Sequence, residues 1–352
     1  MPGTTGFLEA FLGRSFLMKI AILGAGAWGT ALASHASSRH GVFLWSRDPK
    51  VVADINDNHC NSRYLPGIDL PPGLRATDRL PQALEGAGLL VIATSMAGLR
   101  PVMQAVRRSS HGAVIWLCKG LAADTGELAH EVVAGIAPDW DVGCLSGPSF
   151  AQEVASGLPV ALTAAAANDE LALLMVDAFH HGSMRIYRSL DLHGVEVAGA
   201  LKNVMAIATG ISDGLGMGLN ARAALLTRGL AEMTRFGTAH GAQAETFMGL
   251  AGVGDLVLTC TGDLSRNRTV GLKLAQGLAL ADILRDLGHV AEGVVCCRAA
   301  VAAAHAAGVD MPVSQAVLGV IEGRLSPADA AAGLLAREPK AEWRSQSGLL
   351  GG

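Results

Sequence analysis

Three glycines form the first feature of this sequence whose spacing points to chemistry. Gly24, Gly26 and Gly29 follow the apolar run Lys19–Leu23 directly and precede a helical stretch that begins at Thr30. In such a place the first glycine permits a tight turn, the second lets the backbone approach a pyrophosphate, and the third allows the helix to pack closely on the strand. The N-terminus of the helix adds free N–H groups for the phosphates. The spacing therefore predicts a dinucleotide site rather than a glycine-rich turn without a ligand.

The end of the next predicted strand bears on which dinucleotide binds. The run Val42–Trp45 is followed by the sequence SRDP, which contains Arg47 and Asp48. Dehydrogenases that use NAD usually place an acidic residue here for the ribose 2′-hydroxyl group, whereas an arginine can pair with the 2′-phosphate of NADP. We favour NADPH as the cofactor because of Arg47, and Asp48 keeps NADH open as the alternative. A solvated turn residue is the other interpretation of Arg47.

Four further local sequences combine glycine with polar or charged residues. They are CKGL at residues 118–121, LSGPSFA at residues 145–151, GALKN at residues 199–203, and GDL at residues 254–256 leading to SRN at residues 265–267. The first two follow apolar runs typical of strands, and open α/β sheets bind ligands beyond the carboxyl ends of their strands. We therefore expect the first two at the ligand-binding edge of a sheet.

These segments, taken with the glycine pattern, closely resemble the bacterial-type NAD(P)-dependent glycerol-3-phosphate dehydrogenases. They occur in the order of that family and at roughly its spacing, over about residues 18–340. The departures are mild, since Trp28 and Ser149 stand where relatives often carry other aromatic and hydroxyl residues. The resemblance implies reversible reduction of dihydroxyacetone phosphate to sn-glycerol 3-phosphate, which supplies the glycerophospholipid backbone.

The resemblance assigns the proton donor and acceptor role to Lys202, with Lys119 and Asp255 as the other catalytic residues. A free lysine has a pKa near 10.4, which is too high for an efficient general acid or base at neutral pH. Burial, or a second cation such as Lys119, would lower the pKa of Lys202. Asp255 would oppose that shift and orient the ammonium group. A surface lysine is the alternative interpretation, but the neighbouring Ala200 and Leu201 are apolar.

The resemblance also implies a set of substrate contacts. The predicted substrate-binding residues are Lys119, Gly147, Ser149, Lys202, Asp255, Ser265, Arg266 and Asn267. Within this set, Ser265 can cap a following helix whose N–H groups point at an anion. Arg266 adds a forked, permanently charged donor set suited to phosphate. The alternative is an ordinary helix cap with an arginine that faces solvent.

The predicted cofactor contacts come from both ends of the sequence. The predicted residues are Gly24, Gly26, Ala27, Trp28, Gly29, Arg47, Lys119, Ala151, Arg266, Val290 and Glu292. Glu292 has the least support, because a lone glutamate is usually solvated. The predicted reaction needs no metal, since a lysine polarises the ketone and the nicotinamide supplies the hydride.

The elements that must position these residues divide the chain into two parts. Up to about residue 190, short apolar runs alternate with helical stretches. The predicted strands are Lys19–Leu23, Val42–Trp45, Leu89–Ala93, Ala113–Cys118, Val142–Leu145, Val160–Ala164 and Met184–Tyr187. Runs without clean alternation, separated by helices, indicate a sheet that is buried on both faces. Residues 18–190 are therefore predicted to form a Rossmann-like, mostly parallel, doubly wound α/β domain that binds the dinucleotide.

The rest of the chain has a different pattern. Beyond about residue 190, Ala- and Leu-rich stretches at helical spacing follow one another and strand candidates are scarce. Residues 191–345 are predicted to form an all-α substrate-binding domain, with residues 346–352 as a tail and residues 1–17 as an extra N-terminal extension. We expect the two domains to pack tightly, with the site in the cleft between them.

Composition limits the partners and the compartment. The 352 residues carry a net charge of −4, which gives no electrostatic footprint for nucleic acid. No stretch reaches the roughly eighteen uncharged apolar residues of a membrane span. The six cysteines show no zinc or disulfide spacing, so free thiols in the cytoplasm are expected. Relatives of the family commonly self-associate, which makes a homodimer the expected assembly.

Two other functions compete with this interpretation. One is a Rossmann dehydrogenase of hydroxy acids or sugar acids with a helical second domain, which would need groups for a carboxylate instead of a phosphate. The other is a redox sensor that binds NAD(P)H without turnover. The coexistence of Lys119, Lys202 and Asp255 argues against a sensor.

Overall fold

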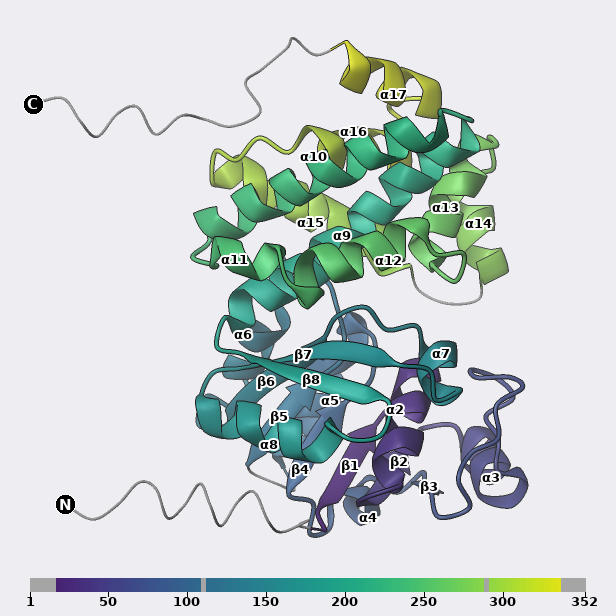
Figure 1. Ribbon diagram of the computed structural model, residues 1–352, viewed down its shortest axis with the longest axis vertical. Helices are drawn as coiled ribbons and strands as arrows, with labels where there is room; N and C mark the ends of the chain where they lie inside the picture. The colour runs from purple at the N-terminus through teal and green to yellow at the C-terminus, as the bar shows by residue number, and fades with distance from the viewer. Residues whose placement is uncertain (1–16, 109–111, 288–290, 337–352) are drawn as a thin grey trace, which may run out of the picture.

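An eight-stranded sheet forms the first half of the molecule (Figure 1). The computed structural model describes residues 17–108, 112–287 and 291–336. In sheet order the strands are β3 (Arg75–Thr77), β2 (Gly41–Trp45), β1 (Lys19–Leu23), β4 (Leu89–Ile92), β5 (Ala113–Trp116), β6 (Asp141–Ser146), β7 (Val160–Ala166) and β8 (Met184–Ser189). Every neighbouring pair is parallel except β6 and β7.

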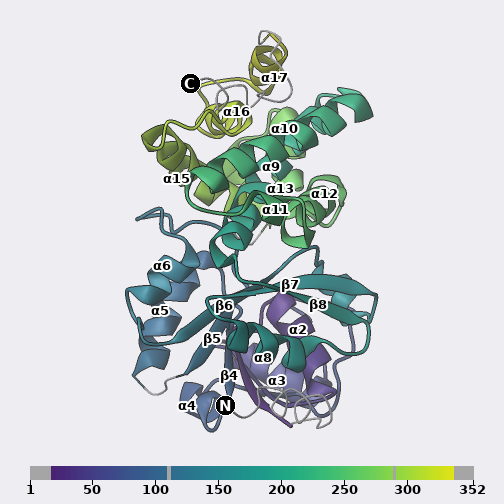
Figure 2. The same cartoon turned by 60° about the vertical axis from the view of Figure 1, so that its left-hand side comes forward.

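Helices cover both faces of this sheet, as Figure 2 shows. One face packs against α2 (Ala27–Ser37), α3 (Pro49–Asn58), α7 (Ala151–Ala155) and α8 (Asp169–Phe179), and the other against α4 (Leu80–Leu84), α5 (Met96–Arg107) and α6 (Ala129–Ala134). Along β1, Ile20 and Ile22 point into the first core, while Ala21 and Leu23 point into the second. Strand side chains alternate between faces, so two buried faces require an apolar residue at every position. The predicted doubly wound α/β fold is confirmed.

Two features of the sheet add detail to the prediction of a mostly parallel sheet. β3 was not predicted, because Arg75–Thr77 is only three residues long and contains no apolar run. β7 runs antiparallel to β6, with Leu145 opposite Ala164. The connection between these two strands contains only the five-residue helix α7. No helix long enough to cross the sheet therefore separates them, and the chain turns back instead.

The second half consists of helices around one central helix. The helices are α9 (Leu192–Gly214), α10 (Gly218–Ala239), α11 (Ala244–Phe247), the π-helix η1 (Leu250–Gly254), α12 (Asp255–Thr261), α13 (Arg266–Ala275), α14 (Leu280–Leu287), α15 (Glu292–Ala306), α16 (Pro312–Ile321) and α17 (Pro327–Leu335). α9 contacts α10, α12, α13, α15 and α16. The prediction of an all-α second part is confirmed.

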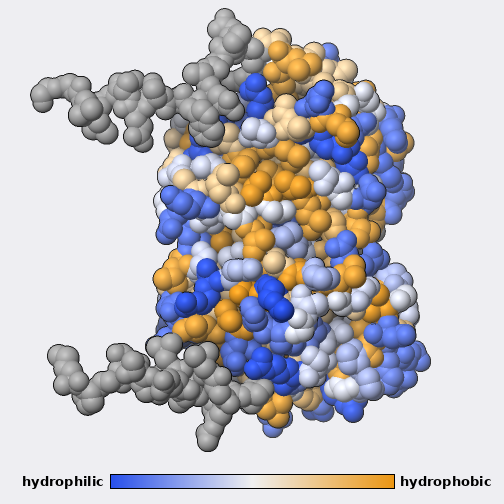
Figure 3. Space-filling view, viewed as in Figure 1, coloured by the Kyte–Doolittle hydropathy of each residue, from blue (hydrophilic) through white to orange (hydrophobic). Residues whose placement is uncertain are grey.

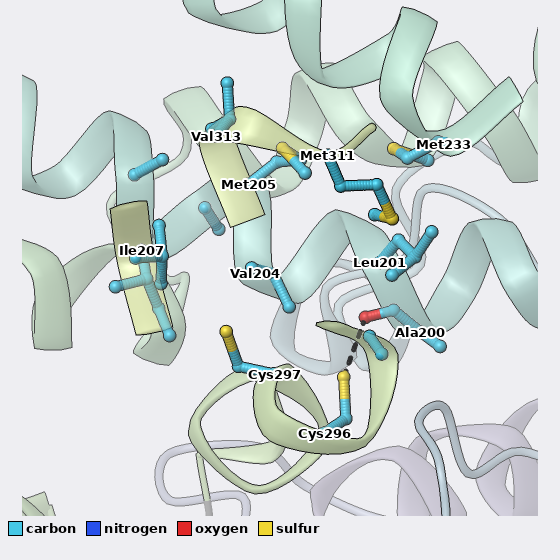
Figure 4. Packing of buried hydrophobic residues seen from close by; sticks show 14 of the residues in the cluster. Ala200, Leu201, Val204, Met205, Ile207, Met233, Cys296, Cys297, Met311 and Val313 are labelled. Carbon is cyan, nitrogen blue, oxygen red and sulfur yellow. Dashed lines mark hydrogen bonds between the residues drawn. The ribbon is translucent and has the colours of Figure 1, made fainter. Parts of the chain in front are cut away.

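The composition of α9 follows from this central position. It is long and apolar enough to cross a membrane, yet the whole of that stretch is buried inside the protein. A mostly apolar helix that is buried on every side is the pattern of a core helix. Figure 4 shows its side chains packed against α15, where the Sγ atom of Cys296 lies 3.5 Å from the carbonyl oxygen of Ala200. All six cysteines are free thiols, as predicted.

Candidate active site

The glycine turn between β1 and α2 has the shape that a dinucleotide requires. Gly24 has φ +130°, and a Cβ atom there would lie 2.6 Å from the carbonyl oxygen of Ala93. A Cβ atom on Gly29 would lie 2.1 Å from the carbonyl oxygen of Gly24. A Cβ atom on Gly26, in contrast, would meet no described atom within 4 Å, and no side chain caps α2. The turn thus leaves open space beside a helix N-terminus, which suits a pyrophosphate.

Three other predicted cofactor residues lie next to this turn. Ala27 and Trp28 form the first turn of α2, and Ala151 begins α7, which packs against α2. The Nε1 atom of Trp28 is buried and has no hydrogen-bond partner among the described residues. A buried indole N–H group normally has a partner. An unused hydrogen-bond donor, the Trp28 indole N–H group, therefore lies in the first turn of α2 beside the glycine turn.

Arg47 and Asp48 differ in how they are used. Asp48 caps α3 by accepting a hydrogen bond from the backbone N of Lys50 at 3.0 Å, and it pairs with Arg63 at 2.7 Å. Arg47 is exposed at the end of β2 and has no hydrogen bond or ion pair within the described part of the chain. The arginine is therefore the group that is free to meet a ligand.

Lys119, Lys202 and Asp255 meet although they come from three separate elements. Lys119 follows β5, Lys202 lies in the middle of α9, and Asp255 begins α12. The Nζ atom of Lys119 lies 2.6 Å from one Asp255 carboxylate oxygen and 3.1 Å from the carbonyl oxygen of Gly147. The Nζ atom of Lys202 donates to the other Asp255 oxygen and, at 2.8 Å, to the hydroxyl group of Thr259. One carboxylate thus orients two ammonium groups.

Thr259 is a member of this site that the sequence analysis missed. It lies four residues after Asp255, on the same face of α12, and its hydroxyl group also donates to the backbone carbonyl of Asp255 at 2.7 Å. The four-residue spacing on a helix is a signal that could have found it. The π-helix η1 ends immediately before Asp255, and single π-turns are frequent at functional sites.

Burial and charge set the protonation of this cluster. Burial lowers the pKa of Lys202 to about 8, with the charge of Lys119 acting in the same direction and Asp255 opposing. Burial raises the pKa of Asp255, but Lys119 and Lys202 outweigh it, so the pKa of this carboxyl lies below its ordinary value. Two lysine side chains therefore face one carboxylate. The excess positive charge suits an anionic ligand.

The SRN segment has one exposed and two buried residues. Ser265 caps α13 as predicted, by accepting a hydrogen bond from the backbone N of Arg268 at 3.3 Å. Arg266 is exposed and has no hydrogen bond or ion pair within the residues described. Asn267 is buried, donates to the side chain of Asn203 at 2.9 Å and accepts from the backbone N of Gly293 at 3.0 Å. The amide of Asn267 therefore joins three helices, which spacing alone did not predict.

The remaining predicted residues lie at the boundary between the halves. Ser149 donates to the carbonyl oxygen of Gly147 at 3.2 Å. Glu292 accepts a hydrogen bond from the backbone N of Met96, the first residue of α5, at 3.2 Å. Burial raises the pKa of Glu292, against the effect of Met96 and of the Arg266 charge. Glu292 is thus held against the sheet half and close to Arg266. Val290 lies outside the described residues.

Comparisons with known proteins agree with this geometry. Residues 19–172 match the family model described as NAD-dependent glycerol-3-phosphate dehydrogenase N-terminus, and residues 191–332 match the corresponding C-terminus. A glycerol-3-phosphate dehydrogenase of Burkholderia orbicola, whose name specifies NAD(P)+, is 58% identical over 332 residues, which are 92% of this chain and all of the relative.

Solved structures give the same result. The glycerol-3-phosphate dehydrogenase of Coxiella burnetii is 39% identical with a TM-score of 0.86, over 91% of this chain and 99% of that chain. The corresponding yeast enzyme is 26% identical with a TM-score of 0.77, over 90% of this chain and 99% of that one. This chain therefore belongs to the NAD-dependent glycerol-3-phosphate dehydrogenase family.

Proposed function

We propose that this chain catalyses the reversible, NAD(P)H-dependent reduction of dihydroxyacetone phosphate to sn-glycerol 3-phosphate and so supplies the glycerophospholipid backbone. The observation that carries the proposal is the buried Lys202, which is held by Asp255 and Thr259 and whose pKa burial lowers to about 8. Such an ammonium group can both give and take a proton at physiological pH. The family membership supports the choice of substrate.

Proton transfer is the task of Lys202 in this proposal. The nicotinamide, when bound, supplies the hydride. The Lys202 ammonium group gives a proton to the ketone oxygen of the substrate, and in the reverse direction its neutral amine accepts a proton from the hydroxyl group. Asp255 stays ionised and orients the ammonium group. Because the pKa of Lys202 is about 8, both of its protonation states are accessible.

Lys119 has a different task. Two of its three donor positions are occupied by Asp255 and by the Gly147 carbonyl oxygen. The third donor position is left for an oxygen atom of the substrate or for a contact with the nicotinamide. We assign the substrate phosphate to Ser265 and Arg266, which combine a helix N-terminus with a guanidinium group. Asn267 contributes by fixing the start of that helix.

The cofactor assignment follows from the glycine turn and from Arg47. The turn offers a backbone path to a pyrophosphate, and Arg47 is unpaired while Asp48 is not. We therefore favour NADPH over NADH. Ala27, Trp28, Ala151, Val290 and Glu292 complete the proposed cofactor contacts.

We further propose a cytoplasmic homodimer. Figure 3 shows hydrophobic surface over the helical half, and Leu219 in the first turn of α10 is 72% exposed. A second copy covering such residues would remove apolar surface from water. Sedimentation of the purified chain as a dimer is the expected result, and a monomer at micromolar concentration would contradict it.

The decisive experiment is an assay of NADPH and NADH oxidation with dihydroxyacetone phosphate. Steady oxidation with this substrate is expected, and it would dismiss the redox-sensor alternative. Unphosphorylated ketones and 2-keto acids serve as comparison substrates. Faster turnover of a 2-keto acid would replace the proposal with the hydroxy-acid dehydrogenase alternative.

A further inference from the structure

Helix α9 carries a second buried charged residue, Glu196, that the proposed chemistry does not use. Glu196 is 8% exposed and lies six residues before Lys202. One of its carboxylate oxygens accepts hydrogen bonds from Trp116 Nε1 and from the backbone N of His130, both at 3.0 Å. The other oxygen pairs with His130 Nδ1. The carboxylate is therefore fully engaged by three donors.

All three donors belong to the sheet half of the molecule. Trp116 is the last residue of β5 and precedes Lys119 by three residues, while His130 lies on α6. Between Glu196 and Lys202, a Cβ atom on Gly199 would lie 3.4 Å from the Cγ atom of Lys119. The hydrogen bonds of Glu196 thus join the two segments that carry the catalytic lysines.

A buried carboxylate is stable only when it is paired. Moving Glu196 away from Trp116 and His130 would leave its carboxylate buried without partners, which is energetically costly. Burial acts to lower the pKa of His130, but the contact with Glu196 outweighs it and the pKa of His130 is raised. Burial also raises the pKa of Glu196, against the contacts with His130 and Trp116, so the two side chains hold a proton between them in a buried hydrogen-bonded pair. This buried contact joins α9 to β5 and α6.

We propose that Glu196 is a positioning residue, which holds Lys202 on α9 against Lys119 at the end of β5. The proposal rests on the proposed function of the two lysines. Asp255 and Thr259 lie in the same half as Lys202, so they stay with it if the halves shift. Lys119 lies in the other half and would move away.

Because Lys119 lies in one half and Lys202 in the other, the proposal predicts in which direction the pH dependence of kcat should shift. The titratable groups that face Lys202 are Lys119 from the end of β5, and Asp255 and Cys260 from α12. Burial and Lys119 both lower the pKa of Lys202, and a shift of the halves weakens both effects. Two further titratable groups, Glu131 and His193, interact electrostatically with His130 rather than with Lys202. Losing Glu196 is therefore expected to raise the pKa of Lys202.

The test measures kcat and KM for dihydroxyacetone phosphate reduction from pH 6 to pH 10. Glu196→Leu is expected to lower kcat at pH 7 about tenfold or more, because small misplacements of catalytic groups are costly. The alkaline limit of kcat, where Lys202 loses its proton, should move to higher pH. Glu196→Gln keeps an oxygen for Trp116 and for the His130 backbone, so it should restore most of kcat and the parental limit.

Glu232 offers a matched control for the loss of a buried carboxylate. It is 1% exposed on α10 and accepts hydrogen bonds from Ser314 N at 3.1 Å and Ser314 Oγ at 3.0 Å, at the start of α16. All these contacts lie within the helical half. Glu232→Leu should therefore leave kcat and its pH limit unchanged in the folded protein, whatever it does to stability.

Two milder variants keep the test decisive if Glu196→Leu does not fold. Trp116→Phe and His130→Ala each remove one side-chain donor, and each should produce a smaller shift of the alkaline limit in the same direction. Parental kcat and an unmoved limit in every folded variant would overturn the positioning role. If the parent itself does not reduce dihydroxyacetone phosphate, the proposed function fails instead.

Discussion

The cations of the proposed ligand site fall into two regions that differ in burial and in pairing. At the reaction end, Lys202 and Lys119 are largely buried, and both hydrogen-bond to Asp255. At the positions proposed for the substrate phosphate and for the 2′-phosphate of the cofactor, Arg266 and Arg47 are exposed and have no ion pair among the described residues. A buried charge needs a partner within the protein, whereas an exposed guanidinium group is satisfied by water. The exposed arginines are therefore available to a ligand's phosphates.

This difference also separates their expected roles. The buried pair has little freedom, so it can hold a proton at a fixed place. The exposed arginines can reach for a ligand but cannot define a reaction geometry. Substitutions in the first region should therefore change turnover, and substitutions in the second should change binding.

Lys202→Met is expected to have the largest effect. Methionine keeps the length and apolar character of the side chain but carries no transferable proton. General acid–base groups typically contribute about 10²- to 10⁴-fold to the rate, so kcat should fall by that factor. Fluorescence titration should show NADPH binding within a few-fold of the parent. A variant that keeps more than about a tenth of the rate would remove Lys202 from the proton transfer.

Asp255→Asn should rank second. The Asp255 charge raises the pKa of Lys202, so its loss lowers that pKa further. The alkaline limit of kcat should move to lower pH, opposite to the shift expected for Glu196→Leu. Breaking a buried ion pair also costs about 3–5 kcal/mol of stability, which urea unfolding measures. An unmoved limit in the folded variant would show that Asp255 does not control Lys202.

Arg266→Ala should affect binding more than turnover. Loss of a hydrogen bond to a charged group costs about 1.5–3 kcal/mol, or roughly ten- to hundredfold in affinity. The Michaelis constant for dihydroxyacetone phosphate should rise by about that factor, while NADPH binding weakens less. The control is Arg324→Ala, which removes another exposed arginine that is distant from Arg266 in the sequence. An unchanged Michaelis constant would place Arg266 outside the substrate site.

Arg47→Ala should have the smallest effect, and only with one cofactor. The Michaelis constant for NADPH is expected to rise by about tenfold, which corresponds to the loss of one charge-assisted contact. That for NADH should hardly change, because NADH lacks the 2′-phosphate. Equal weakening of both cofactors would contradict the assignment, and Asp48 would become the residue to test.

The sheet half was the more predictable part of the fold. Buried strands such as Lys19–Leu23 are continuous apolar runs, and the glycine turn has a spacing fixed by backbone geometry. The edge strand β3 has no such run, and it is held by backbone pairing to β2 and by the side chain of Asn56, which hydrogen-bonds the backbone of Ala76. The reversal at β7 depends on the path of the preceding loop, which no local pattern records.

The site was predictable only where local chemistry or family resemblance applied. Spacing could show that Ser265 caps a helix, because a cap is a contact between near neighbours. It could not bring Lys119, Lys202 and Asp255 together, since their meeting depends on how two halves pack. The contacts of Glu196 could not be predicted for the same reason. Its partners are remote in sequence, and nothing local distinguishes it from a solvated glutamate.

The single helix α9 limits how this chain can change in length. Glu196, Gly199 and Lys202 recur at intervals of three residues along it, and each faces a different partner. Adding one residue between Glu196 and Lys202 would turn one relative to the other by about 100°. Insertions are therefore expected to be tolerated in the loops that follow α9 and to be excluded within this part of the helix. Divergent members of the lineage should vary there by substitution alone.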